Sequence, residues 1–421
     1  MSKLSLIVSK KNYREFKGAD WPSYEDFINH KYSVTDAIQT EITEFVEAME
    51  ENYNNIATAR TDELSLANQK RQSHVFYDKK FQGTHCEIPW NTLGINSNGN
   101  VFICASPSWI PIFIGNVLEV DNIYDILNSD IALKIRQEIL KGRYYYCNQK
   151  LCDFFSFKKT SDFQSHATTD TDLQPLEFED SPELHVSSIP ANIIFDFDLT
   201  CNFKCPSCRS ETINSNADHI IRPINDRIVD KIKRLVIDKI EKQFVNIRWA
   251  GGEPFMSDVY LELLDYIVST GKRNITNIIH TNGSLLKSKA ELVKNLLPYT
   301  SDLRISFDAG CEQTYKLTRV GGQWNNLIEN VKFVKDLIER NNFKTRLYGD
   351  FVVQKNNYKD LPLFANLCRE NGLLMNIQKM WNWDTWNKDV FDDMNIYNSD
   401  HYLYNDLKKH FQLANLPMAE N

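Results

Sequence analysis

The sequence predicts an α/β fold in which six β-α repeats form one parallel sheet, for which a curved or partly closed barrel is one solution. From residue 191 onward, strand-like runs alternate with helical patterns, as is typical of parallel sheets with right-handed crossovers. The expected strands are Asn192–Leu199, Phe244–Ala250, Ile275–Thr281, Asp302–Asp308, Thr345–Val353 and Leu373–Lys379. Two of the intervening helical patterns are Ile228, Ile232, Leu235, Val236, Ile240 and Leu327, Val331, Val334, Leu337. Ligands in such folds bind at the carboxyl ends of the strands.

Composition limits the class of protein. Of the 421 residues, 42% are hydrophobic and 25% are charged, as in ordinary soluble globular proteins. The formal net charge of −8 argues against nucleic acid as a partner, because a duplex binder needs a cationic surface. No apolar run approaches the roughly 20 residues that span a bilayer, and the start of the chain does not read as a secretory signal. Nine cysteines suit metal binding in a reducing compartment, so we expect a cytoplasmic protein without a membrane partner.

Three cysteines follow the first expected strand directly. Cys201, Cys205 and Cys208 have the spacing C-x3-C-x2-C. Three thiolates on one loop can hold three irons of a 4Fe–4S cluster, whereas structural clusters normally take four cysteines. The missing ligand leaves one iron open for chemistry.

A second motif follows the second expected strand. Trp249-Ala-Gly-Gly-Glu-Pro254 contains two glycines, which allow a backbone to approach a ligand closely. A simple strand-to-helix turn is the alternative interpretation. Because both motifs follow parallel strands, we expect them on the same rim of the sheet.

Together these motifs resemble the radical S-adenosylmethionine (SAM) superfamily. The resemblance implies a partial (β/α)6 TIM-like barrel of the radical SAM type, with Cys201, Cys205 and Cys208 binding a 4Fe–4S cluster. The open iron of that cluster would chelate SAM, and reduction would release a 5′-deoxyadenosyl radical.

The resemblance also implies which residues bind SAM: Gly251, Gly252, Glu253, Pro254, Ser306, Asp308 and Arg319. For Arg319 a surface salt bridge is an open alternative. Family members often carry an aromatic residue where this chain has Ser207, and we expect Phe203 to supply apolar shielding instead. The sequence does not assign a general base; Asp308 and Asp350 are plausible only by position.

Four further cysteines lie upstream, at Cys86, Cys104, Cys147 and Cys152. The pair Asn98-Gly99 between the first two predicts a tight β-hairpin. This segment resembles the SPASM and twitch modules, small cysteine-rich α+β modules of radical SAM enzymes that carry auxiliary clusters and usually follow the barrel. The resemblance implies one auxiliary 4Fe–4S cluster, of the single-cluster, twitch-like kind. A structural zinc site with four cysteines is the alternative.

The expected domain boundaries follow from these patterns. Residues 1–80 form a polar extension with an amphipathic helix around residues 38–49, 81–155 the auxiliary module, 156–190 a linker, 191–412 the radical SAM core and 413–421 a tail. Cys311 could face the site as a hydrogen-atom donor or be a small buried residue. Three tryptophans after the last strand could shape a substrate pocket or pack beneath the module: Trp381, Trp383 and Trp386.

The expected reaction is hydrogen abstraction by the 5′-deoxyadenosyl radical from a small-molecule or carbohydrate-like substrate, with net oxidation assisted by the auxiliary cluster. A maturase of ribosomal peptides or protein side chains using the same chemistry is the first alternative. A non-catalytic iron–sulfur or zinc protein is the second. The expected electron donor is a reductant such as flavodoxin or ferredoxin.

Overall fold

The computed structural model describes residues 86–418 apart from 108, 111, 143, 145, 148–151, 153–180, 220 and 383–384. The helix expected around residues 38–49 and the side chain of Trp383 lie outside these residues. No helix within the described ranges is both long and apolar enough to cross a membrane.

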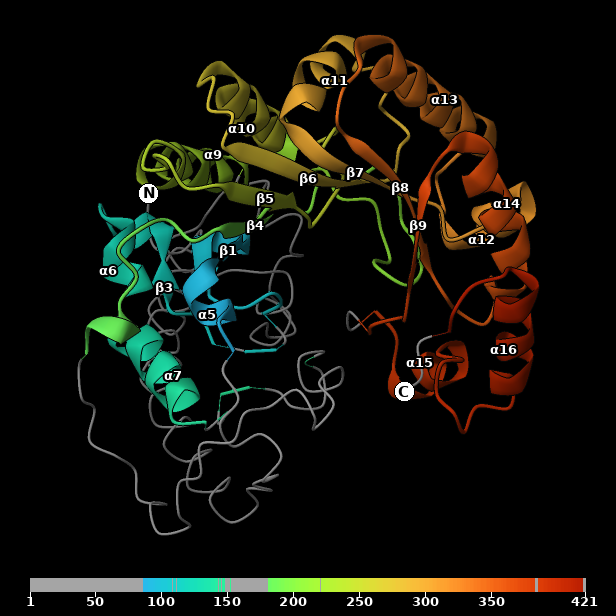
Figure 1. The fold of residues 1–421 in the computed structure, drawn as a ribbon, viewed down its shortest axis with the longest axis horizontal. Coiled ribbons are helices and arrows are strands. Elements are labelled where there is room, and N and C mark those ends of the chain that lie inside the picture. The colour runs from blue at the N-terminus through green and yellow to red at the C-terminus, as the bar shows by residue number, and fades with distance from the viewer. Residues whose placement is uncertain are drawn as a thin grey trace, which may run out of the picture.

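The predicted parallel sheet is confirmed. Within the described residues, nine strands form one sheet in the order β3-β2-β1-β4-β5-β6-β7-β8-β9, and every neighbouring pair from β4 to β9 is parallel. These six strands match the expected ones to within a few residues at each end: β4 Asn192–Asp196, β5 Val245–Trp249, β6 Ile275–Thr281, β7 Thr300–Ser306, β8 Arg346–Val352 and β9 Leu374–Gln378. Figure 1 shows the curvature that makes the sheet a partial barrel.

The upstream cysteine segment extends this same sheet. Strand β1 (Thr92–Asn96) pairs in parallel with β4, so that Asn96 lies opposite Asp196. Strands β2 (Asn100–Phe102) and β3 (Gly115–Asn116) follow in antiparallel order. The predicted hairpin is present, and Asn98 and Gly99 both have positive φ, at 66° and 80°, as a type I′ turn requires. The sequence predicts a module ahead of the barrel, but not one that shares its sheet.

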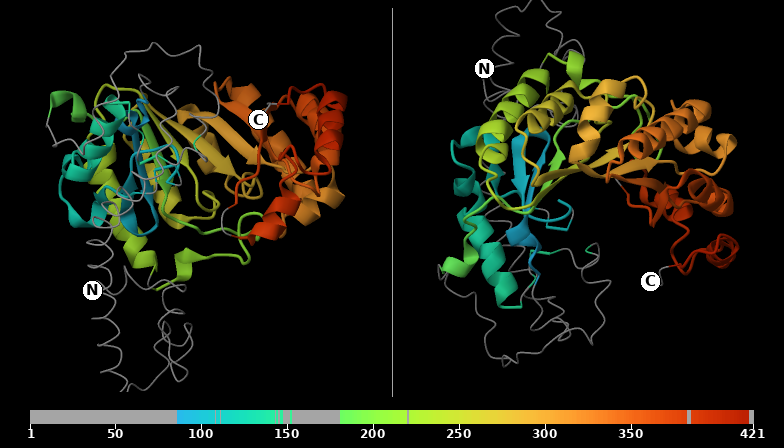
Figure 2. Two further views of the ribbon diagram at one scale, coloured as in Figure 1. Left: turned by 90° about the horizontal axis from the view of Figure 1, so that it is seen from below. Right: turned by 45° about the horizontal axis from the view of Figure 1, so that its top comes forward.

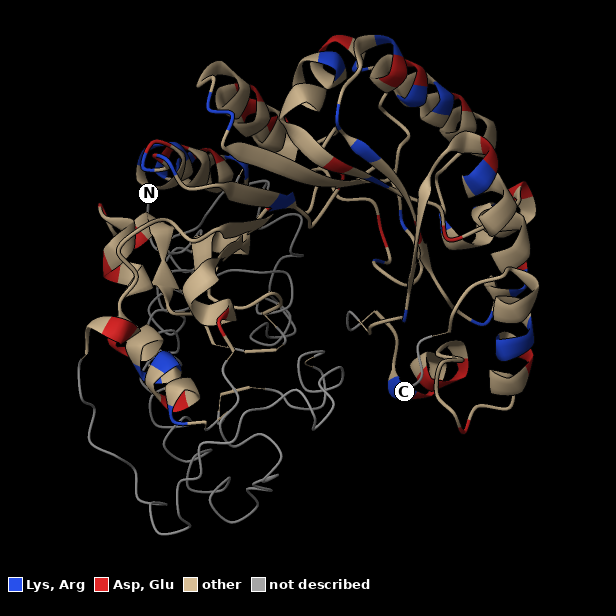
Figure 3. Cartoon of the chain, in the orientation of Figure 1, with Lys and Arg blue, Asp and Glu red and all other residues tan. Residues whose placement is uncertain are grey.

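Helices cover the convex face of the barrel (Figures 1 and 2). They are α9 Ile221–Ile232, α10 Asp258–Ser269, α11 Ala290–Leu296, α12 Glu312–Thr318, α13 Trp324–Asn341 and α14 Leu361–Asn371. A π-helical turn, Lys233–Ile237, continues α9. The core lies between these helices and the sheet, where Trp249, Ile279 and Val331 are fully or almost fully buried. Charged residues gather on the outer helices (Figure 3), as an amphipathic helix packed on a sheet requires.

The remaining elements are short. The upstream module contains α5 Ile88–Asn91, α6 Ile123–Leu127 and α7 Asp130–Leu140, and the chain closes with α15 Lys388–Met394 and α16 Tyr404–Leu413. Single 3₁₀ turns occupy Ser97–Gly99, Val117–Glu119, Pro182–Leu184, Ser215–Ala217, Leu297–Tyr299 and Tyr358–Asp360.

A buried arginine joins the parts of the module. The Arg136 side chain on α7 donates to the carbonyls of Pro89, Leu127 and Leu184 at 2.8–3.1 Å. The last of these belongs to residues 181–190, which the sequence assigns to a linker. Nearby, Val186 exchanges two hydrogen bonds with the Asn128 side chain. This end of the expected linker is therefore packed against the module.

Candidate active site and cluster sites

The cysteine loop after β4 is closed by backbone hydrogen bonds. The Cys201 N–H donates to the Ile213 carbonyl at 2.7 Å, and the Ile213 N–H returns a bond of 3.2 Å. Within the loop, the Cys208 N–H donates to the Cys205 carbonyl at 2.9 Å. Cys201 and Cys205 are buried, whereas Cys208 is exposed. The loop therefore presents three thiols with one open side.

The glycine motif after β5 holds this loop in place. The N–H of Gly252 donates to the Asp198 carbonyl at 3.0 Å, and that of Glu253 to the Thr200 carbonyl at 2.7 Å. Gly251 has φ +89°, and a Cβ on Gly252 would lie 2.1 Å from the Thr200 carbonyl oxygen. Any residue with a side chain would collide with backbone at this point. The two glycines thus permit close approach to the cysteine loop, in addition to any approach to a ligand.

The Glu253 carboxylate lies inside the protein. It is 1% exposed and accepts hydrogen bonds from the Thr281 hydroxyl at 2.7 Å and the Asn282 N–H at 2.6 Å. Burial raises the pKa of Glu253, and these hydrogen bonds oppose the rise. The carboxylate therefore ties the end of β5 to the end of β6.

Two side chains that the sequence did not single out complete the support of the loop. The Arg209 guanidinium donates to the carbonyls of Leu199 and Gly251 at 2.8 and 2.9 Å, and lies 3.4 Å from the Cys208 sulfur. The Tyr260 hydroxyl on α10 accepts from the backbone N–H groups of Phe197 and Asp198. Neither contact has a local sequence signal, because the partners meet only in the folded chain.

Arg319 reaches the same site from the segment after α12. Its Nη2 is 2.7 Å from the Asp308 carboxylate, and its Nη1 is 3.8 Å from the Cys205 sulfur. Burial opposes the charge on Arg319, but Asp308 and Cys205 outweigh it and raise the pKa of the guanidinium. The Arg319 Nε is buried and has no hydrogen-bond partner. This arginine lies against the cysteine loop and not on the outer surface.

The remaining predicted residues lie at the ends of strands or in the segments that follow them. Ser306 ends β7 and is partly buried, and Asp308 follows it with φ 50°. Pro254 is buried next to Glu253. Phe203 is buried, and its ring would lie 2.9 Å from a Cβ on Gly322, so this side chain packs beneath the loop. Cys311 donates to the Asp360 carboxylate at 3.3 Å.

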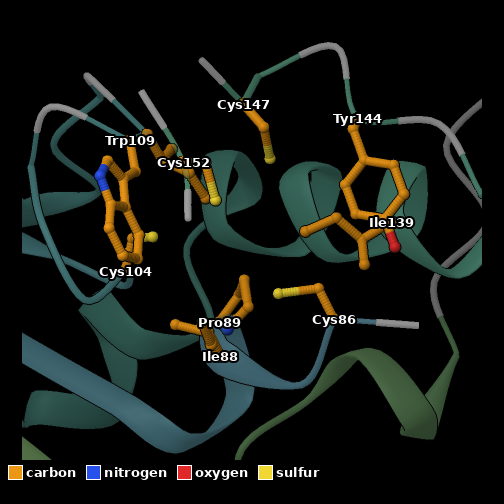
Figure 4. Close-up of a pocket in the computed structure, with 10 residues that line it drawn as sticks. Cys86, Ile88, Pro89, Cys104, Trp109, Ile139, Tyr144, Cys147 and Cys152 are labelled. Carbon is orange, nitrogen blue, oxygen red and sulfur yellow. The ribbon is translucent and has the colours of Figure 1, made fainter. Parts of the chain in front are cut away.

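The four upstream cysteines line one small cavity. Cys86 precedes α5, Cys104 follows β2, and Cys147 and Cys152 follow α7. Figure 4 shows their sulfur atoms directed into a common space. The other walls are almost entirely apolar: Ile88, Pro89, Trp109, Ile110, Ile139 and Tyr144. Residues that are far apart in the sequence are thus brought to one enclosed site.

Burial and backbone hydrogen bonds act in opposite directions on the pKa of the Cys104 thiol. Burial raises its pKa to about 12, while the backbone N–H groups of Ser106 and Ala105 hydrogen-bond the sulfur and lower it. Among the described residues, no group of three or more His, Cys, Asp or Glu side chains is arranged to hold a single metal ion.

Family models match both regions of the chain. Residues 199–364 match the model of the radical SAM superfamily, and residues 86–153 match that of the SPASM iron–sulfur cluster-binding domain. The chain is a radical SAM enzyme with an upstream SPASM module. The radical SAM domain implies a 4Fe–4S cluster and SAM, and the SPASM domain implies auxiliary iron–sulfur clusters.

Two curated relatives are each named "Probable GTP 3',8-cyclase". The protein of Methanocaldococcus jannaschii is 27% identical over 177 residues, and that of Methanococcus maripaludis is 26% identical over 179. In both cases the match covers 42% of this chain and 54% of the relative. The chain therefore spans about half the length of the curated relatives it matches.

Solved structures show only partial likeness. One is native anSMEcpe with bound AdoMet and Kp18Cys peptide, at 18% identity and a TM-score of 0.33, covering 45% of this chain and 51% of that one. Another is archaeal TYW1, at 15% identity and a TM-score of 0.30, covering 51% of this chain and 72% of that one.

The concave face of this radical SAM enzyme carries a row of charged side chains. Arg248 on β5, His280 on β6 and Arg304 on β7 lie on one face, flanked by Asp196 on β4 and Asp350 on β8. Arg304 pairs with both Asp350 oxygens at 3.1 and 2.8 Å. Sequence reasoning indicates only Asp350, because alternation within a strand shows which residues share a face but not which strands are neighbours.

Two groups of this row have strongly altered acidity. Burial raises the pKa of Asp196 to about 6, against the opposing charges of Arg248 and Arg209. Burial, Arg304 and Arg248 lower the pKa of His280 to about 3. His280 is therefore neutral at physiological pH, and each arginine of the row has a carboxylate beside it.

Proposed function

We propose that this radical SAM enzyme abstracts a hydrogen atom from a small, polar, carbohydrate-like molecule and completes a net two-electron oxidation with one auxiliary cluster. The observation that carries the substrate class is the row of paired charges on the concave face. The proposed setting is the reducing cytoplasm, with a carrier such as flavodoxin or ferredoxin as electron donor.

The proposed ligands of the SAM-binding cluster are Cys201, Cys205 and Cys208. The exposure of Cys208 beside two buried thiols supports this assignment, because the open side leaves room for a non-protein ligand. When bound and reduced, this cluster with SAM supplies the 5′-deoxyadenosyl radical.

The protein's own residues would place SAM. Gly251 and Gly252 would let the backbone approach it, Pro254 would fix the turn that follows, and Ser306 would offer a hydroxyl. Arg319 would bind the SAM carboxylate in a charge-assisted contact, and its unpartnered Nε supports that role. Asp308 holds the guanidinium in place through the 2.7 Å ion pair. Glu253 would act through the fold, since its carboxylate is already bonded to Thr281 and Asn282.

The proposed ligands of the auxiliary cluster are Cys86, Cys104, Cys147 and Cys152. Four thiols account for one fully ligated 4Fe–4S cluster. The match to an iron–sulfur cluster-binding domain and the enclosed, mostly apolar cavity support a cluster at this site. A fully ligated cluster suits the acceptance of an electron from a substrate radical.

The concave row suits a neutral, hydroxyl-bearing substrate. Arg304 with Asp350, and Arg248 with Asp196, offer donors and acceptors side by side without a large excess of either charge. A hydroxyl group can both donate and accept, so this row can satisfy several hydroxyls of one molecule. Asn376 adds a further amide, bonded to Asp350 at 3.0 Å.

The test is anaerobic reconstitution with iron and sulfide, reduction in the presence of SAM, and mass spectrometry for 5′-deoxyadenosine. The wild type should form this product, and the Cys201/Cys205/Cys208→Ala variant should not. Equal product from both proteins would refute the ligand assignment.

Defined compounds then test the substrate class. Neutral monosaccharides and polyols, GTP (suggested by the names of the curated relatives) and unstructured peptides are added separately, and the rate of 5′-deoxyadenosine formation is compared with the rate without additive. A higher rate with a sugar or polyol supports the proposal. Stimulation by peptides alone would favour a peptide maturase.

A further inference from the structure

A side chain of the barrel reaches the upstream cysteine site. Arg248 points from the concave face of β5, and its Nη2 donates to the Ala105 carbonyl at 2.6 Å. Ala105 directly follows Cys104, one of the four cysteines around the module's cavity. The contact thus joins the barrel to the backbone beside a proposed cluster ligand.

The peptide that Arg248 holds also faces the Cys104 sulfur. The Ala105 carbonyl and the Ser106 N–H belong to one peptide unit, which is planar, and in the trans form these groups point in opposite directions. The N–H groups of Ser106 and Ala105 hydrogen-bond the sulfur of Cys104. Arg248 therefore holds one edge of a peptide whose other edge is directed at the thiol.

We propose that Arg248 is a positioning residue that sets the reduction potential of the auxiliary cluster by keeping the Ser106 N–H directed at Cys104. Hydrogen bonds to cluster sulfurs are one of the factors that set such potentials, and groups that orient metal ligands strongly affect the site. An N–H donated to sulfur stabilises the more negative, reduced state, so it raises the potential. The inference rests on the proposed assignment of Cys104 as a cluster ligand.

The surroundings of Arg248 keep its side chain in one place. Asp196 on β4 favours its charged form, while burial and Arg304 on β7 oppose it and lower the pKa of the guanidinium. The same Asp196 lies at the glycine motif, where a Cβ on Gly251 would be 2.9 Å from its Oδ1. Arg248 is thus fixed between the barrel's own carboxylate and the module's backbone.

The experiment is a redox titration of the reconstituted enzyme, with the auxiliary cluster followed by electron paramagnetic resonance. Arg248→Gln should shift its potential to more negative values. Arg248→Lys keeps the charge but loses the guanidinium fork, so we expect a smaller shift in the same direction. Arg346→Gln is the matched control: Arg346 is an exposed arginine of the same sheet, paired with Asp302, and its variant should titrate as the wild type does.

A second measurement reports the peptide itself. Hydrogen–deuterium exchange of the backbone N–H groups of Ala105 and Ser106 should accelerate in Arg248→Gln and stay unchanged in Arg346→Gln. Unchanged potential and unchanged exchange in Arg248→Gln would overturn the inference. If Arg248→Gln does not retain the cluster, the reduction potential is measured in Arg248→Lys instead. A potential equal to that of the wild type in Arg248→Lys would overturn the inference.

Cys104→Ala distinguishes a failure of this inference from a failure of the assignment of Cys104 as a cluster ligand. Loss of the auxiliary signal in Cys104→Ala, with no shift in either Arg248 variant, would remove the role of Arg248 alone. An intact auxiliary signal in Cys104→Ala would instead remove the ligand assignment, and the role of Arg248 with it.

Discussion

The two cysteine sites of this chain are built in opposite ways. In the barrel, three thiols come from one short loop, Cys201 to Cys208, and Cys208 is exposed. In the module, four thiols come from separate segments and line a cavity with apolar walls. The first site is local in sequence and open in space, and the second is dispersed in sequence and enclosed.

On the proposed ligand assignments, this difference would separate the site of reaction from the site of electron storage. An open metal site admits a substrate or cofactor, whereas a closed one is occupied by protein ligands alone. The barrel loop also has two cationic neighbours, since Arg209 and Arg319 both approach its sulfurs. The module site has the Arg248-held peptide instead. On the proposed ligand assignments, the chain places its chemistry at the barrel rim and an electron acceptor in the module beside it.

The comparison is tested most severely by removing one thiol from each site. Cys208→Ala should lower 5′-deoxyadenosine formation by more than about 100-fold, because a lost ligand exceeds the roughly 10–100-fold that residues supporting a metal ligand typically contribute. Cys152→Ala should remove the auxiliary cluster's paramagnetic signal and leave 5′-deoxyadenosine formation within about threefold of wild type, because the SAM site is complete without it. Both are measured on anaerobically reconstituted protein. Equal losses of 5′-deoxyadenosine in the two variants would show that the sites do not differ in this way.

The module's enclosed site also depends on a buried polar network. Arg136→Met would leave the carbonyls of Pro89, Leu127 and Leu184 without their donor, and three unsatisfied buried acceptors cost about 3 kcal/mol or more. Hydrogen exchange in α7 and β1 should therefore accelerate, while peptides of β7 and β8 keep their protection.

The matched control for this variant is Arg340→Met. Arg340 lies near the end of α13, where its exposed side chain pairs with Asp336, so its replacement should leave exchange in the module unchanged. Uniform acceleration across the whole sheet in Arg136→Met would mean that module and barrel unfold as one unit.

The sequence predicted the local parts of this architecture and missed the long-range ones. Strand runs, the Asn98-Gly99 hairpin and the cysteine and glycine motifs are each encoded within a few residues, and the structure contains them. Strand β1 pairs with β4, so that Asn96 lies opposite Asp196. These residues are far apart in the sequence, and the hydrophobic periodicity of a segment does not indicate which distant strand pairs with it. Arg136, Arg209 and Arg248 were missed for the same reason, because their partners are backbone carbonyls that any sequence could supply.

The glycine motif shows that an expectation from sequence can give only part of the physical reason for a residue. From the sequence, Gly251 and Gly252 suggested close approach to a ligand. In the structure, Gly252 also lies where a Cβ would meet the Thr200 carbonyl. The sequence does not indicate which two backbone segments pack against each other, so this structural role of Gly252 could not be predicted. The same residue can serve the fold and also bind a ligand.

The smallest expected effect concerns how the open site holds its cofactor. Arg319→Lys keeps a positive charge beside Asp308 but loses the planar fork, and Arg and Lys are not equivalent at such contacts. We expect the affinity for SAM to fall about tenfold, equivalent to about 1.4 kcal/mol, with the cluster itself retained. Anaerobic titration calorimetry with SAM measures this, and Arg340→Lys on the exposed face of α13 is the control. Unchanged affinity in Arg319→Lys would limit Arg319 to its ion pair with Asp308. The open site would then keep its exposed thiol, but Arg319 would not be a cation that binds the cofactor.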